Sequence, residues 1–149
     1  MRKVYYKSWL AKLLLFGGFS TAMLFGEIHT KRTTALSEKT KRHESIHCEQ
    51  YEEVTLIAFF LAVIISALLG WSVWPFLIVP VFYYILYGIE AAISWVHHFF
   101  STKKKDAAAA ADEAYYNSMF EMEAYEGESD PEWIQARKFC HWLKFFGKV

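Results

Sequence analysis

Apolar residues are concentrated in one block in the middle of the chain. Residues 54–70 contain no charged residue, and residues 71–100 contain a single acidic one, Glu90. Each stretch is about as long as a helix that crosses the roughly 30 Å hydrocarbon core of a bilayer. Between them, residues 70–75 hold a glycine, a proline and two tryptophans, which is typical of a turn at a membrane interface. The pattern therefore predicts an integral membrane protein with a helical hairpin of two spans within residues 54–100.

Positive charge lies on both sides of this block and is absent from the turn. Lysines and arginines between residues 31 and 42 precede the block, and the lysines at 103–105 follow it as a membrane-flanking anchor. Cytoplasmic flanks of membrane spans are enriched in Lys and Arg, so we expect both ends of the hairpin in the cytoplasm, with the lipid bilayer as a partner. The net charge is zero and no basic cluster is large, which argues against nucleic acid as a partner.

Residues 1–36 give a less regular pattern. The apolar run 9–25 is broken by Lys12 and by two glycines, and polar and apolar residues alternate over 27–31. A third span over 9–25 would place the basic residues before it outside the cell, against the charge rule. We therefore expect a short strand pair or a re-entrant segment against the membrane surface, with a third span as the alternative. The run also resembles a signal peptide, but no small-residue cleavage site follows it.

The polar segments on either side of the block are predicted to be helical. Ser37 is a suitable N-cap for a helix over 37–53, and Asp106 for a second helix over 106–126. A third helix over about 131–146 follows a cap and a proline. The expected fold is mainly α and forms a single membrane-embedded domain over 1–149. Its parts are the N-terminal segment 1–36, the helix 37–53, the hairpin 54–100 and the C-terminal helices 101–149.

The first polar helix carries the chain's main chemical motif. Residues 43–47 read His-Glu-Ser-Ile-His, an HExxH pentapeptide, and positions i and i+4 share one face of a helix. His43 and His47 can therefore bind one zinc ion, and Glu44 would lie beside the open coordination position, where it can act as general base. A chain of this composition contains the pentapeptide by chance on the order of 2% of the time, so a third ligand is needed to support the prediction.

Zinc in a hydrolase usually has three protein ligands and a water molecule. The acidic residues that could supply the third ligand are Glu121, Glu123, Glu126 and Glu128. Around them, residues 120–125 read Phe-Glu-Met-Glu-Ala-Tyr. This segment resembles the E-x-x-A-D pattern of gluzincin-type membrane metallopeptidases, in which the glutamate is the third ligand. The chain is also similar to small, largely uncharacterised bacterial membrane proteins that carry H-E-x-I-H-x-x-Q, then F-E-x-E-A-Y, then an acidic turn and an R-K-F-like helix.

The resemblance covers the polar parts, about half of the chain, and it implies which residues form the site. Glu121 would be the third zinc ligand, with Glu123 as the alternative. Tyr125 stands where the family has an aspartate, so a carboxylate partner for a zinc histidine must come from elsewhere. The separation between His47 and Glu121 is also longer than in that group. Candidates for an oxyanion donor or an outer-sphere partner are Tyr125, Tyr116, His141 and Arg137.

These features together predict a zinc-dependent metallopeptidase of a bacterial inner membrane. It would be a multi-pass protein that hydrolyses peptides or membrane proteins at a site facing the cytoplasm. Two alternatives stay open. One is a metal-binding protein without activity, and the other is a small structural or partner-binding membrane protein in which HExxH is accidental.

Three further features have simpler interpretations. A carboxyl inside a span often marks a functional site, but we interpret Glu90 as hydrogen-bonded to Ser94 or to a neighbouring helix. His97 and His98 lie near the end of the second span and are interpreted as interface residues rather than as haem or metal ligands. The chain has two cysteines, too few for a disulfide framework, and both are expected to be reduced.

Overall fold

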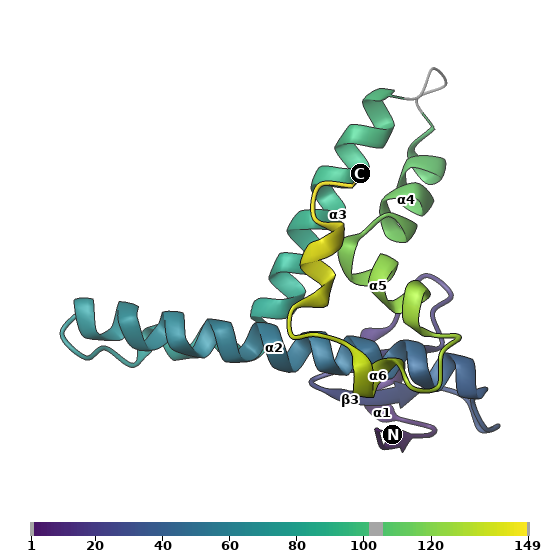
Figure 1. The fold of residues 1–149 in the computed structure, drawn as a ribbon, viewed down its shortest axis with the longest axis horizontal. Helices are drawn as coiled ribbons and strands as arrows, with labels where there is room; N and C mark the ends of the chain where they lie inside the picture. Colours follow the sequence, from purple (N-terminus) through teal and green to yellow (C-terminus); the bar gives the residue numbers. More distant parts are fainter. Residues whose placement is uncertain (1, 102–105, 149) are drawn as a thin grey trace. The chain divides into compact units, whose positions relative to one another are not determined.

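The structure is a computed structural model that describes residues 2–101 and 106–148 (Figure 1). The fold is mainly helical, with a small three-stranded sheet and two long apolar helices, which confirms the predicted class in its coarse form. The chain forms two compact units. The first contains the residues up to Glu52 and Ala124–Phe139, and the second contains Glu53–Glu123 and the residues from Cys140 onward. The lysines at 103–105 lie outside the described residues.

The sheet belongs to the first unit and has the strand order β1-β3-β2. Strands β2 (Thr21–Leu24) and β3 (Glu27–Thr30) form an antiparallel hairpin, which is the strand pair predicted within residues 1–36. Phe25 and Gly26 both have positive φ, +53° and +82°, as a two-residue hairpin turn requires. The short strand β1 (Val4–Tyr5) pairs in parallel with β3 and was not predicted.

A short helix, α1 (Trp9–Leu14), occupies the start of the apolar run 9–25. Ser8 caps it, because the Ser8 Oγ accepts a hydrogen bond from the Ala11 N–H at 3.3 Å. Ala11 is fully buried. Since six helical residues are followed by a strand, the third helical span considered for this run does not form.

The HExxH segment and the first apolar span lie on one helix. Helix α2 (Glu38–Leu68) runs without a break through the boundary predicted near residue 53. The Oγ of Ser37 accepts from the Thr40 N–H at 3.1 Å, so Ser37 caps the helix as predicted.

The second apolar stretch contains a 3₁₀ segment, η1 (Trp74–Val81), followed by α3 (Phe82–Ser101). Pro80, which has no N–H, lies inside η1. Both α2 and the stretch Trp74–Ser101 are long and apolar enough to cross a membrane, and only 6% of the most apolar window of Trp74–Ser101 is buried. Helix α4 (Ala107–Tyr116) lies beside α3 in Figure 1, and the Trp95 Nε1–H donates to the Ala107 carbonyl at 3.2 Å.

The helix predicted over 106–126 is in fact two helices, α4 and α5 (Met119–Gly127). Its predicted start is confirmed, because an oxygen of Asp106 accepts from two N–H groups of the first turn of α4. The break follows Asn117. In a continuous helix the Met119 N–H would donate to the carbonyl of residue 115, but here it donates to the carboxylate of Glu90 on α3. The helical hydrogen-bond pattern of α4 is therefore not continued at Met119, where an acceptor distant in sequence replaces the helical one and α5 starts.

The third helix predicted over about 131–146 is wrong. The chain forms one short helix, α6 (Trp133–Ala136), and a 3₁₀ turn, η2 (His141–Phe145). Between them Cys140 takes a left-handed conformation with φ +54°. The cause is again a distant acceptor, because the Glu53 carboxylate accepts from the Cys140 N–H at 3.0 Å and from the Trp142 Nε1–H at 3.1 Å.

Candidate metal centre

The two HExxH histidines face each other on α2. Their Nε2 atoms are 3.2 Å apart, and the rings meet edge to face with centroids 4.8 Å apart. His43, Glu44 and His47 are each less than a tenth exposed. Two nitrogens bound to one tetrahedral zinc at about 2.0–2.1 Å are about 3.3 Å apart. The spacing of the histidine nitrogens therefore fits a shared zinc ion.

Each imidazole is held through its other nitrogen. The Nδ1 of His47 is 2.8 Å from the Gln50 Oε1, and the Nδ1 of His43 is 3.2 Å from a carboxylate oxygen of Glu128. Both partners are acceptors, so each Nδ1 carries the hydrogen and donates it. The two Nε2 atoms then face each other at a spacing that one shared zinc ion fits.

The end of α5 and the residue after it, from Ala124 to Glu128, lie in the same unit as this pair of histidines. The ring of Tyr125 lies 4.9 Å from the ring of His43, and Glu128 holds its Nδ1. Glu121 and Tyr125 are at positions i and i+4 of α5, and Glu128 directly follows its last residue. A nitrogen from each of His43 and His47 and a carboxylate oxygen of Glu121 all lie within 4.8 Å of one another, a group that could hold a metal ion.

The alternative ligand, Glu123, does not belong to this group. It lies two positions after Glu121, about 200° around an α-helix, and so on another face of α5. The side chain is fully buried. Among the described residues, the group that could hold a metal ion contains Glu121 and does not contain Glu123.

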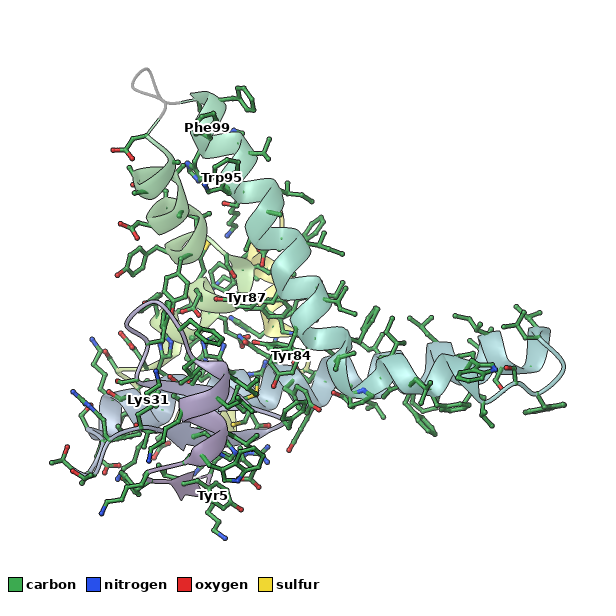
Figure 2. All side chains as sticks on the ribbon, turned by 180° about the vertical axis from the view of Figure 1, so that it is seen from behind. Tyr5, Lys31, Tyr84, Tyr87, Trp95 and Phe99 are labelled. Carbon is green, nitrogen blue, oxygen red and sulfur yellow. The ribbon has the colours of Figure 1, made fainter. Side chains whose placement is uncertain are left out.

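Helix α3 holds Glu121 within the second unit. The hydroxyl of Tyr87, labelled in Figure 2, donates to the Glu121 Oε1 at 2.9 Å. The neighbouring Phe120 is fully buried, with its ring against Tyr83, Tyr87 and Trp142. A carboxylate has two oxygens, so Tyr87 can orient one while the other binds a cation.

The other predicted donors lie in different places. Tyr125 contacts His43, as described above. Tyr116 is on α4, is 56% exposed and packs against the ring of Tyr115. His141 begins η2 with its ring against Phe145, and Arg137 follows the last residue of α6. Tyr125 is therefore a donor candidate that lies directly beside the histidine pair.

Cys48 is a structural thiol although it follows His47 directly. It is fully buried, and burial raises the pKa of its thiol to about 12. Both cysteines are free, as predicted. A thiol with this pKa stays protonated at neutral pH and packs as a small apolar side chain.

Two residues of the site were not assigned their roles from the sequence. Gln50 lies three residues after His47, a spacing that puts both on one stripe of the helix. Glu128 was a candidate ligand, but it pairs with His43 instead and supplies the carboxylate partner that Tyr125 cannot. Glu90 bonds to the start of α5, which agrees with the neighbouring-helix interpretation and not with Ser94.

Comparisons with known proteins give no relative: no family model matches the chain, and neither a curated protein nor a solved structure matches it. The resemblance to gluzincin-type peptidases therefore stays a prediction, and function is inferred from the geometry of the site.

Proposed function

We propose that this protein is a zinc-dependent membrane metallopeptidase that hydrolyses peptide bonds at the cytoplasmic face of a bacterial inner membrane. The observation that carries the proposal is the pair of facing Nε2 atoms of His43 and His47 at 3.2 Å, with each Nδ1 held by an acceptor. Two imidazoles and the Glu121 carboxylate are the donor set of catalytic zinc sites, which keep a fourth position open.

The donor set fits zinc in chemistry and nearly in distance. The three ligand atoms lie within 4.8 Å of one another, whereas two ligand atoms on one zinc are about 3.3 Å apart. The carboxylate would also bring one negative charge to a dication, which two neutral imidazoles cannot do.

In the proposed reaction, zinc supplies a Lewis acid that polarises the substrate carbonyl and makes water acidic enough to act near neutral pH. Glu44 follows His43 in the chain and is 8% exposed. Its carboxylate accepts a proton from the attacking water and delivers it to the leaving amine. Tyr125, beside His43, is placed to donate a hydrogen bond to the charge that develops on the carbonyl oxygen.

The membrane location is supported by the apolar segments. A core helix of a soluble protein is mostly buried, but only 6% of the most apolar window of Trp74–Ser101 is buried. Large aliphatic side chains are exposed there, among them Leu77 and Ile93. On α2, His47 precedes Val54 by seven residues, or roughly 10 Å of helix, so a span that begins near Val54 puts the metal site at the membrane boundary.

A Glu44→Gln variant tests the catalytic part of this proposal. Glutamine keeps the size of the side chain but cannot accept the proton, so the purified variant in detergent should bind zinc normally and lose cleavage of a casein-type or membrane-protein substrate. The matched control is Glu38→Gln on the exposed first turn of α2, which should cleave like the unaltered protein. Cleavage by Glu44→Gln at the unaltered rate would contradict the assignment of the base.

A further inference from the structure

The first unit presents large apolar side chains to solvent along the N-terminal helix. Trp9 is 69% exposed, Leu13 58% and Phe16 75%. Trp9 and Leu13 are at positions i and i+4 and share one face of α1, and Phe16 lies two residues after the end of the helix. On the opposite side Ala11 is fully buried. Helix α1 is therefore anchored through a small residue while its large residues point outward.

Hydrogen bonds fix both ends of α1 to the strand β3 and the residue after it. The Ser8 Oγ caps the start of the helix and shares a hydrogen bond with the His29 Nδ1 at 2.8 Å. At the other end the Lys31 Nζ donates to the Leu15 carbonyl at 2.7 Å, and Lys31 is labelled in Figure 2. The exposed apolar face is therefore held in place by the sheet and is not a loose terminal tail.

The same segment is strongly basic. Residues 2–32 contain six Lys or Arg and one acidic residue, Glu27, although the whole chain has a net charge of zero. Lys12 belongs to α1, and Lys7 lies two residues before its start. Tryptophan and phenylalanine beside lysine are typical of a segment that lies in the interface of an anionic bilayer, where rings enter the headgroup region and ammonium groups meet lipid phosphates.

We propose that residues 9–19, with Trp9, Leu13 and Phe16 as the inserted side chains, bind the surface of an anionic bilayer. This contact lies in the plane of the membrane and does not cross it. The inference rests on the membrane insertion in the proposed function and is independent of zinc and of catalysis. Helix α2 starts in the same unit and leads into the apolar span.

Depth measurements on the full chain in vesicles test this inference. A single environment-sensitive fluorophore is attached to Phe16→Cys, to Ile93→Cys on α3 or to the exposed control Glu38→Cys, each in a Cys140→Ser background. Cys48 is buried with a raised pKa and does not compete for the label. The vesicles contain phosphatidylglycerol and a phosphatidylcholine that carries bromine atoms high on its acyl chains, which quench nearby fluorophores.

The labels at Phe16 and Ile93 should lose most of their fluorescence, and the label at Glu38 should keep it. Replacing phosphatidylglycerol by phosphatidylcholine should reduce quenching at Phe16 and leave Ile93 unchanged. A quenched Ile93 label with an unquenched Phe16 label would overturn the interfacial contact and leave the proposed function intact. Self-quenching at Phe16 that grows with protein density would assign the face to a second copy and also overturn the inference. An unquenched Ile93 label would instead contradict membrane insertion.

Discussion

The Nε2 atoms of His43 and His47 lie 3.2 Å apart, each on a ring whose Nδ1 donates to an oxygen. Two histidine nitrogens at this spacing fit one shared zinc ion. The hydrogen bonds at Nδ1 orient both rings, as the outer-sphere partners of zinc histidines do.

Glu128→Gln should weaken zinc binding about 10- to 100-fold, because loss of the carboxylate leaves His43 with a weaker acceptor and a less basic Nε2. Affinity is measured by competition with a chromophoric chelator. Glu132→Gln, an exposed position just before α6, is the matched control and should bind as the unaltered protein does. Equal affinity in both variants would show that Glu128 does not support the metal.

Glu90→Ala should destabilise the protein by about 1–3 kcal/mol, because the Met119 N–H at the start of α5 loses its acceptor. Glu90→Gln keeps a carbonyl oxygen that can accept the same hydrogen bond, so this variant should lose much less stability. Thermal unfolding in detergent compares the two. If both variants unfolded at the same midpoint temperature as the unaltered protein, the hydrogen bond from the Met119 N–H to Glu90 would not stabilise the start of α5.

Gly127→Ala should destabilise the protein by about 1–3 kcal/mol through a steric conflict. A Cβ at this position would lie 2.4 Å from the ring of Trp133, so α6 would have to move away from the end of α5. Gly88→Ala is the matched control, because nothing lies within 4 Å of its Cβ, and in a helix it should be neutral or slightly stabilising. Chemical denaturation of both variants checks this difference.

Stability of the first unit should fall as the pH drops below about 6.5, the ordinary pKa of histidine. Burial lowers the pKa of His29, which Glu27 opposes only in part. The unfolded chain therefore takes up a proton before the folded chain does, and stability is lost from about pH 6.5 down to the lower native value. Hydrogen exchange at β3 amides, followed over this pH range, measures how steeply stability depends on pH. The His29→Gln variant should show a weaker dependence. An unchanged slope in that variant would assign the effect to other groups.

Local rules predicted the parts of this structure that local interactions determine. The cap at Ser37, the cap at Asp106 and the HExxH face all follow from residues within one or two turns of each other. The errors occur where a side chain distant in sequence accepts a hydrogen bond from a backbone N–H. Glu90 does so at the break between α4 and α5, and Glu53 does so within the third predicted helix. Neither partner can be identified from spacing along the chain.

The candidate site was predicted in the same uneven way. The two histidines come from one motif on one helix, and their geometry follows from helical spacing alone. Glu121 needed a comparison of patterns across more than seventy residues, counted from His47, which include the apolar block 54–100. Gln50 and Glu128 needed the structure, because a carboxylate or amide becomes a histidine partner only when its distance to Nδ1 is known.

Zinc stoichiometry of the purified protein tests the central claim most directly. The unaltered chain should hold one zinc ion per molecule, and His43→Ala should hold none or bind it far more weakly, because the ion loses one of two facing nitrogens. Lys41→Ala, whose side chain pairs with the exposed Glu38 and supplies no ligand atom to the group, should keep its zinc. Equal zinc in the unaltered protein and in His43→Ala, or none in either, would contradict a metal centre at HExxH.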